Sequence, residues 1–190
     1  MIKHVMLPLN TDSVVCLNAG DMVSLSGKIF VARDAAHERF VKAMKAGEES
    51  PFPIKDATIF YAGPAPTKPG SVIGPIGPTT SGRMDVFTPF LLEHGLRGMI
   101  GKGSRSQEVL ESMKKYKAVY FGATGGVAVL LSSCVTAVTV VAYEDLGPEA
   151  ILQLTVDNMQ LVVLADCYGG DLYKTGQAEA RGFIEQTLKD

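Results

Sequence analysis

The chain has 190 residues, of which 46% are hydrophobic and 20% are charged, and its formal net charge is −2. This length predicts one domain over residues 1–190 with a buried core. The small net charge argues against nucleic acid or an acidic membrane surface as a partner, and the high apolar content predicts a face that is buried against another subunit.

Short apolar runs separated by turn residues dominate the start of the chain. They predict strands at Val5–Leu9, Val14–Leu17 and Met22–Val31, with turns at 19–21 and 26–27. The front of the molecule is therefore expected to be rich in β-structure.

A helix is predicted next, because Asp34 has the character of an N-cap and apolar residues at helical spacing continue to Gly47. A strand is expected at Ala57–Ala62. The Pro/Gly-rich stretch from Gly63 to Pro78 is long for a loop inside a compact domain, and such loops are more often functional than accidental.

Helices and strands then alternate to the end of the chain. A helix is expected to run to about Leu96, with Pro89 as a kink or early break, and Ser104 and Gln107 form a capping-box pattern that opens a helix to Tyr116. The remaining predicted elements are strands from Met99 and at Ala118–Phe121, Ala137–Tyr143, Ile151–Val156 and Leu161–Ala165, and a C-terminal helix at Thr175–Leu188. This order indicates an α/β fold with a mixed sheet.

No charged residue occurs from Ala118 to Tyr143, a run longer than the roughly 20 residues that cross a bilayer. Glycines and hydroxyl residues interrupt it, and its last third is β-branched. We therefore expect a strand, a glycine turn, a short helix and a strand, all of them buried, and no membrane span.

Three cysteines, Cys16, Cys134 and Cys167, are far apart and form no Cys-x-x-Cys pair. This spacing argues against a metal site or a disulfide framework made by this chain alone, and it is typical of a reducing cytoplasm. The first residues show no secretory pattern. We expect buried structural thiols and a cytoplasmic location.

Residues 77–85 read Gly-Pro-Thr-Thr-Ser-Gly-Arg-Met-Asp and carry the strongest functional pattern in the chain. The glycines and the proline punctuate a loop, in which Thr79 and Thr80 precede Arg83. A guanidinium group is suited to clamp a carboxylate with two hydrogen bonds. A hydroxyl beside such a clamp indicates chemistry on a small anionic acid; the alternative is an ordinary turn with Asp85 in the first turn of a helix.

Two further segments accompany this loop, Ala32–Phe40 (Ala-Arg-Asp-Ala-Ala-His-Glu-Arg-Phe) and Met99–Ser104 (Met-Ile-Gly-Lys-Gly-Ser). In this order the trio resembles the β subunit of the class I, iron–sulfur-dependent hydro-lyases, the family of fumarate hydratase and L-tartrate dehydratase. The family's loop, Gly-Pro-Thr-Thr-x-Gly-Arg-Met-Asp, is matched at every fixed position. The resemblance covers nearly the whole chain and implies a swivelling β/β/α domain with a mixed sheet and flanking helices.

The resemblance also implies roles for single residues. Arg33, Arg83 and Lys102 would bind the substrate, and Thr79 would perform the acid/base step at carbon. Flanking cations in a dry site favour the alkoxide form of a hydroxyl, which gives the role of Thr79 a physical basis. On the residues alone, Thr80 and Ser81 are alternatives.

Two other side chains are candidates by type. Asp34 is either a helix cap or a supporting group, and His37 is either a histidine on a helix face or a supporting group. A role in orienting Arg33 or the threonine loop is expected for both rather than direct proton transfer.

The family resemblance implies that this chain is half of an enzyme. A separate α subunit would carry a [4Fe-4S] cluster, two αβ units would assemble further, and the substrate would be a small dicarboxylate. The form of the loop, with Gly82 and Asp85, resembles the fumarate branch, which implies reversible hydration of fumarate to L-malate. The alternative is the β subunit of L-tartrate dehydratase, which converts tartrate to oxaloacetate.

A dinucleotide-binding domain is the less favoured alternative. The strand that precedes Gly122–Gly126, the helix after it and the acidic pair Glu144 and Asp145 have the layout of a dinucleotide-binding βαβ unit. The turn reads Gly-x-x-Gly-Gly, however, and lacks the Gly-x-Gly-x-x-Gly fingerprint. We therefore expect these glycines to allow close packing of a buried helix.

Overall fold

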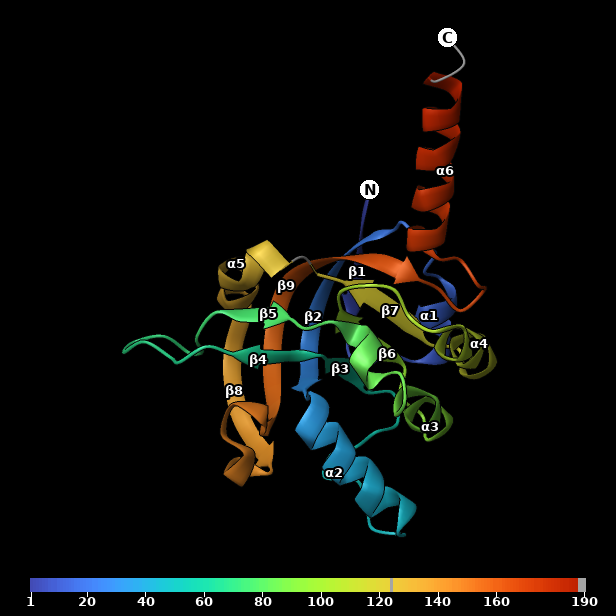
Figure 1. Ribbon diagram of the computed structural model, residues 1–190. Helices are drawn as coiled ribbons and strands as arrows, with labels where there is room; N and C mark the ends of the chain where they lie inside the picture. The colour runs from blue at the N-terminus through green and yellow to red at the C-terminus, as the bar shows by residue number, and fades with distance from the viewer. Residues whose placement is uncertain (124, 188–190) are drawn as a thin grey trace.

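The computed structural model describes the backbone of residues 1–123 and 125–187, and the side chains of residues 1–123 and 126–181. Two positions of the predicted elements, Thr124 in the glycine turn and Leu188 at the end of the last helix, lie outside the described residues. The fold is a mixed α/β fold with flanking helices, as predicted (Figure 1).

The main sheet is mixed, and its strands follow the order β1-β2-β3-β6-β7-β9-β8. An additional antiparallel pairing joins β2 to β9, so the pairings from β2 through β3, β6, β7 and β9 return to β2 and close a ring. The strands are β1 (Ile2–Met6), β2 (Met22–Val31), β3 (Thr58–Phe60), β6 (Gly98–Gly101), β7 (Val119–Gly122), β8 (Val135–Ala142) and β9 (Ile151–Ala165).

One edge of the sheet collects the loops that matter for function. The pairs β2–β3, β3–β6 and β6–β7 are all parallel, so the carboxyl ends of these strands lie at the same edge. Arg33 follows β2, Tyr61 follows β3 and Lys102 follows β6. Ligands of α/β folds commonly bind at this edge.

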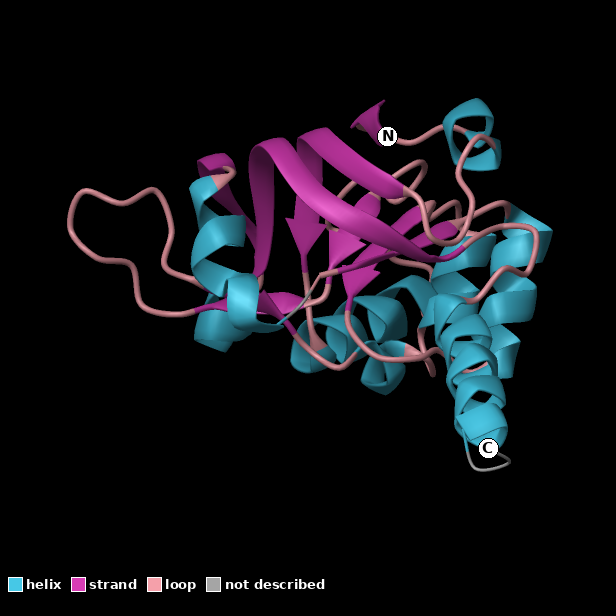
Figure 2. Ribbon diagram, turned by 90° about the horizontal axis from the view of Figure 1, so that it is seen from above, coloured by secondary structure: helices cyan, strands magenta, loops and turns pink. Residues whose placement is uncertain are grey.

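Two apolar cores lie on opposite faces of the strands, because successive side chains of a strand point to opposite sides. Ile59 and Met99 belong to one core, and their neighbours Phe60 and Ile100 belong to the other. The first core packs under α2 (Asp34–Lys45), α3 (Thr88–Glu93) and α4 (Gln107–Tyr116). Figure 2 shows most helices gathered along one side of the curved layer of strands.

The second core is covered by smaller elements. They are α1 (Thr11–Val15), α5 (Ala128–Ser133) and the hairpin of β4 (Ala62–Pro64) with β5 (Ile76–Pro78). The loop between β4 and β5 projects from the body, and α6 (Leu172–Thr187) extends away from it at the other side (Figure 1).

Several predicted boundaries are confirmed. β2 has the predicted bounds, and α2 ends just before Gly47, which adopts a left-handed backbone with φ 89°. The uncharged run to Tyr143 forms a strand, the 3-10 turn η2 (Gly125–Val127), a helix and a strand, in the predicted order. The predicted burial is wrong for most of α5 and β8, whose side chains are largely exposed or half-buried. No described helix is both long and apolar enough to cross a membrane.

Three local predictions are wrong. Val14–Leu17 is not a strand, because Asn10 and Ser13 form a capping box that starts α1. The residues at 26–27 do not make a turn; they form a bulge within β2, where Gly27 has a φ of 127°. The predicted break between Val156 and Leu161 is absent, since β9 continues through Asn158 in a left-handed conformation.

The caps of two helices also differ from the prediction. Arg33 is the N-cap of α2, and Asp34 is its first helical residue. Ser106, rather than Ser104, caps α4 by accepting a hydrogen bond from the backbone N–H of Val109. Pro89 lies in the first turn of α3, where a missing N–H costs nothing, so it starts this helix rather than breaking it.

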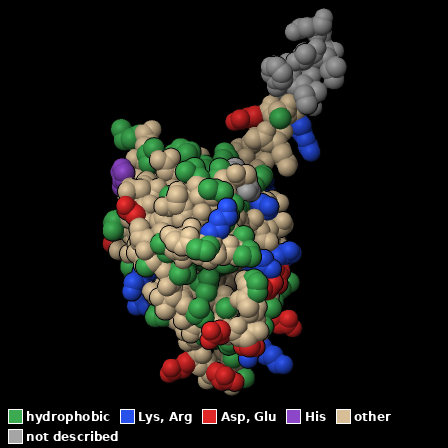
Figure 3. Space-filling model, turned by 90° about the vertical axis from the view of Figure 1, so that its left-hand side faces the viewer, with side chains coloured by type: hydrophobic (Ala, Val, Ile, Leu, Met, Phe, Trp, Pro, Cys, Tyr) green, Lys and Arg blue, Asp and Glu red, His purple; other side chains and the backbone are tan. Residues whose placement is uncertain are grey.

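The side that carries α5, β8 and the projecting loop is rich in exposed apolar side chains. Val129, Leu130, Val138 and Val140 are exposed there. Figure 3 looks at this side and shows hydrophobic side chains across its middle, with acidic side chains toward its lower end. The prediction that an apolar face is buried against another subunit stays a prediction.

Candidate functional site

The threonine loop lies across the ends of β3 and β6. The backbone N–H of Thr79 donates to the carbonyl of Tyr61 at 2.7 Å, and that of Ser81 donates to the carbonyl of Lys102 at 2.9 Å. Thr80 and Lys102 also form an isolated parallel bridge. The strand ends therefore fix the backbone of the loop, and the short 3-10 helix η1 (Ser81–Met84) follows.

The side chain of Ser81 attaches this loop to the strands that it crosses. Its side chain is fully buried, its Oγ accepts from the backbone N–H of Lys102 at 3.1 Å, and it lies 2.9 Å from the Tyr120 hydroxyl. A side chain at Gly101 would collide with the Ser81 Oγ. The glycine of the Met-Ile-Gly-Lys segment is thus required for the loop to sit on the strand.

Arg83 joins Thr79 to Asp34 in what we call the open cluster (Arg83, Asp34 and Thr79). Its Nη2 donates to the Asp34 Oδ2 at 2.5 Å and to the Thr79 Oγ1 at 2.9 Å. The Arg83 side chain is 49% exposed and that of Asp34 is 41% exposed. A cationic donor on the Thr79 oxygen stabilises negative charge that develops on it.

Arg33 lies beside this cluster and is more enclosed. Its Nη2 donates to the Glu149 Oε1 at 2.5 Å, and the other oxygen, Oε2, accepts from the backbone N–H of Ala35 at 2.9 Å. Burial raises the pKa of Glu149, but the Ala35 N–H and the charges of Arg33 and Arg83 outweigh it, so the net pKa is lowered. The two arginines therefore flank Asp34, and a carboxylate pairs with each.

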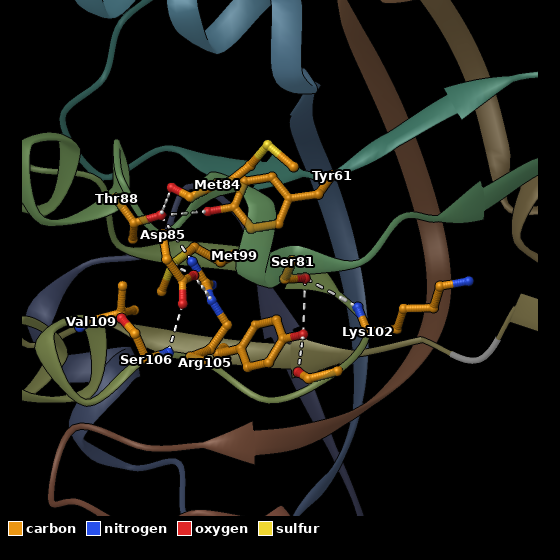
Figure 4. Close-up of polar contacts among 12 residues, drawn as sticks. Tyr61, Ser81, Met84, Asp85, Thr88, Met99, Lys102, Arg105, Ser106 and Val109 are labelled. Carbon is orange, nitrogen blue, oxygen red and sulfur yellow. Dashed lines mark hydrogen bonds and ion pairs between the residues drawn. The ribbon is translucent and has the colours of Figure 1, made fainter.

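The backbone of Lys102 lies at the same edge of the sheet, directly after β6. Its side chain is exposed, and no described residue forms a hydrogen bond or an ion pair with its ammonium group. In Figure 4 the Lys102 side chain points away from the buried residues around Arg105. The structure thus joins Asp34, Thr79 and Arg83 by short contacts, pairs Arg33 beside them with Glu149, and places Lys102 next to the loop without a contact between side chains.

The two threonines of the loop differ. Thr79 is half-buried and accepts the bond from Arg83, whereas Thr80 is exposed and its hydroxyl has no hydrogen bond to a described residue. This difference favours Thr79 over Thr80 as the hydroxyl group whose negative charge Arg83 would stabilise.

His37 is fully buried on α2 and is not open to a ligand in this structure. Its ring contacts Phe40, Tyr61 and Phe87, and its Nδ1 lies 2.9 Å from the carbonyl oxygen of Arg33. Burial lowers the pKa of His37 to about 4, so the ring is neutral at pH 7. Its geometry fits a support of the Arg33 backbone rather than an acid that touches substrate.

The sequence patterns missed a buried cluster directly behind the loop (Arg105, Asp85 and Thr88; Figure 4). Arg105 Nε donates to the Asp85 Oδ1 at 2.7 Å, and its Nη2 donates to the Thr88 Oγ1 at 2.8 Å. The guanidinium also lies over the rings of Tyr61 and Tyr120. Asp85 could have been found from the sequence, because it is a fixed position of the loop motif. No sequence pattern points to Arg105 or Glu149.

The described residues do not fit a metal or iron–sulfur site of their own. They contain no group of three or more His, Cys, Asp or Glu side chains arranged to hold a metal ion. Cys16 is exposed, Cys134 is half-buried and Cys167 is buried. The expectation of three buried thiols is therefore wrong for Cys16, which directly follows the short helix α1 on the surface.

The layout of a dinucleotide-binding unit is not formed by the described strands. In a dinucleotide-binding βαβ unit the two parallel strands are neighbours, but here β9 lies between β7 and β8 and pairs antiparallel with both. Asp145 is engaged with Arg39 at 2.6 Å. The adjacent hollow of about 540 Å³ between α5 and β9 has no charged residue in its lining, which offers little to a phosphate.

Comparisons with known proteins find a matching family model and several relatives. The family model described as the fumarase C-terminus matches residues 2–176. The anaerobic class I fumarate hydratase of Escherichia coli (strain K12) is 42% identical over 154 residues, which are 80% of this chain and 28% of that protein. Fumarate hydratase 2 of Leishmania major is 38% identical over 156 residues, with 81% and 28% covered.

A relative of similar length comes from Methanocaldococcus jannaschii, and its name assigns it provisionally as the beta subunit of an L(+)-tartrate dehydratase. It is 38% identical over 172 residues, which are 87% of this chain and 88% of that protein. By contrast, the chain spans 28% of the length of the two fumarate hydratases named above. With a family model that covers residues 2–176, the chain belongs to the fumarase C-terminal family.

Proposed function

We propose that this chain is the β subunit of an iron–sulfur-dependent hydro-lyase that reversibly hydrates fumarate to L-malate. The observation that carries the proposal is the 2.9 Å hydrogen bond from Arg83 Nη2 to Thr79 Oγ1 at the carboxyl edge of the sheet. It combines a carboxylate-binding cation with a hydroxyl group in one motif loop. The names of the class I fumarate hydratase relatives support the choice of reaction.

The proposed roles follow from the chemistry of each group. Arg33 and Arg83 bind the two carboxylates, since a guanidinium pairs with a carboxylate through two parallel hydrogen bonds. Lys102, whose exposed ammonium is free of contacts with the described residues, adds a third cation at the same edge. Both arginines already hold a carboxylate, of Glu149 and Asp34, which is the ligand type that the substrate would present.

The hydration balances with one water molecule. Its hydroxyl group adds to one carbon of the double bond, a proton adds to the other carbon from the hydroxyl of Thr79, and the remaining proton of the water restores the Thr79 hydroxyl. In the reverse direction the Thr79 oxygen takes the proton from carbon, and the leaving hydroxyl group gains a proton to depart as water. The Arg83 donor offsets the negative charge on the Thr79 oxygen in both directions.

The activation of the hydroxyl group is assigned to a partner. The described residues offer no ligand cluster for it, and we propose that an α subunit holds a [4Fe-4S] cluster, with two αβ units in the assembly. When bound, that cluster supplies a Lewis acid to the hydroxyl group of the substrate.

The second candidate is dehydration of L-tartrate. The relative from Methanocaldococcus jannaschii favours it, because this chain covers 88% of that protein. Fumarate is favoured by the form of the motif loop, in which Gly82 and Asp85 resemble the fumarate branch. A site selective for tartrate would need a group dedicated to the second hydroxyl.

The deciding experiment is an assay of the enzyme purified anaerobically with its natural partner. We expect a higher kcat/KM for L-malate than for L-tartrate on the same preparation. A clear preference for tartrate would replace the substrate but keep the family and the site. Activity toward neither acid would remove the proposed function.

A further inference from the structure

We propose that Glu149 is a positioning residue that holds Arg33 in place as the fixed carboxylate clamp of the site. The inference concerns a residue of the 3-10 helix η3 (Glu144–Glu149), at its junction with β9. Its consequence for catalysis rests on the proposed function, whereas its geometric part does not.

Both carboxylate oxygens of Glu149 accept hydrogen bonds from the start of α2. Oε1 binds the guanidinium of Arg33, and Oε2 accepts from the N–H of Ala35 in the first turn of α2. Arg33 is the N-cap of that helix but provides no side-chain cap itself. Glu149 therefore supplies the missing cap, and a carboxylate is favoured there by the helix dipole.

The opposite side of the Arg33 guanidinium is also confined. A Cβ atom at Gly63 would lie 2.7 Å from the Arg33 Nη1, so the guanidinium rests directly on the backbone of β4. The next residue after Glu149, Ala150, is buried, and Ile151 belongs to the core under α2. The carboxylate is thus presented from a rigid junction.

The free donors of Arg33 show what this clamp leaves for a ligand. Its Nε is buried and has no hydrogen-bond partner among the described residues. Nη1 has no recorded hydrogen bond within that part of the chain either, while Nη2 is taken by Glu149. Because Nε is buried and shares no edge of the guanidinium group with Nη1, the donors that remain for a substrate carboxylate are those of Nη1 and the second N–H of Nη2.

The two arginines of the site therefore differ in how enclosed they are. The Arg33–Glu149 pair has side chains 30% and 24% exposed, and a backbone group, the Ala35 N–H, also binds its carboxylate. The Arg83–Asp34 pair is more exposed, and its third group is a side-chain hydroxyl, that of Thr79. Arg33 is the fixed arm, and Arg83 is the arm that can adjust to the substrate.

The first test measures the clamp without using activity. The full chain is treated with phenylglyoxal, a dicarbonyl reagent that modifies arginine, and modification of Arg33 and Arg83 is followed by peptide mass spectrometry. In the wild type Arg33 is expected to react more slowly than Arg83. In Glu149→Gln the rate at Arg33 should rise at least about threefold, since an amide keeps the shape but loses the charge-assisted bond. An unchanged rate overturns the proposal.

The second test uses the assembled enzyme. Glu149→Gln should raise the KM for the dicarboxylate about tenfold and change kcat less than about threefold, because Arg33 binds the ground state and the transition state alike. Asp145→Asn on the same η3 segment is the matched control, because Asp145 pairs with the exposed Arg39; both of its kinetic constants should stay at the wild-type level.

The outcomes separate the alternatives. An unchanged KM with reduced stability would make Glu149 a helix cap only and would overturn the positioning role. A lower KM would mean that Glu149 competes with the substrate for Arg33, which also overturns it. A wild-type enzyme that is inactive on both acids would remove the proposed function, and the arginine-modification test would still decide the clamp.

Discussion

The open cluster and the buried cluster have the same composition, one arginine, one aspartate and one threonine, and both draw on the loop from Thr79 to Asp85. They differ in solvent exposure. The Arg83 side chain is 49% exposed, whereas that of Arg105 is 1% exposed and stacks on two tyrosine rings. An arginine that is enclosed on all sides holds the fold, and one that keeps an open side is available to a ligand.

This difference explains why one short motif serves two purposes. Residues that point outward, Thr79 and Arg83, form the proposed site, while Ser81, Met84 and Asp85 point into the molecule and attach the loop. Because a buried ion pair loses much when one partner is removed, the inner residues control stability. The outer residues are expected to control catalysis, and the variants below test that separation.

The largest effect is expected for Thr79→Ala in the assembled enzyme. Removal of the acid/base group should lower kcat by roughly 100- to 10,000-fold with a smaller change in KM, and the folded state should be little affected. Thr80→Ala is the matched control and should be much milder. If Thr80→Ala proved the more damaging, the acid/base role would belong to Thr80.

The second-largest effect is expected for Arg83→Lys. Loss of a bidentate, charge-assisted pair costs about 2–4 kcal/mol in transition-state binding, which is a roughly 30- to 1000-fold lower kcat/KM. The midpoint of urea unfolding should stay near that of the wild type, because the side chain is half exposed. Near-normal kcat/KM would place Arg83 outside the site.

Asp85→Asn should show the opposite pattern. It leaves the buried Arg105 guanidinium without its carboxylate, and such a loss costs about 3 kcal/mol of the free energy of unfolding. Asp145→Asn, in an exposed pair with Arg39, should cost less than about 1 kcal/mol. Similar losses in the two variants, measured by urea unfolding, would contradict the distinction between buried and open pairs.

The smallest expected effect is a pH dependence from His37. Its pKa is lowered by burial from 6.5 to about 4, so the unfolded chain binds more protons between these values and stability falls as the pH is lowered through this window. The loss at pH 4.5 relative to pH 8 should be about 2–3 kcal/mol. In His37→Phe the contribution should vanish; an equally steep pH profile would show that other groups cause it.

Local signals predicted the elements that depend on local sequence. The alternating run of β2 and the apolar spacing of α2 gave their bounds to within a residue or two. The run Val14–Leu17 failed because a short apolar run cannot be told from a buried helical turn by periodicity. The hairpin of β4 and β5 was not predicted, because glycine and proline are depleted in strands and indicate a loop instead.

The candidate site was predictable where its members are close in sequence. Thr79 and Arg83 are four residues apart, and their contact follows from one loop. Glu149 lies 116 positions from Arg33, and Arg105 becomes buried only when β3, β6 and β7 are assembled. No local pattern carries such contacts, since the sheet topology alone brings these residues together.

The long strand β9 determines when the sheet can finish folding during synthesis of the chain. Its residues Leu152–Val162 pair with β2, near the other end of the chain, so the ring cannot close on the ribosome until nearly all of the domain has been synthesised. Contacts of such large sequence separation slow folding. Until β9 arrives, one edge of β2 stays unpaired in the nascent chain, and Arg33 has no Glu149 to meet.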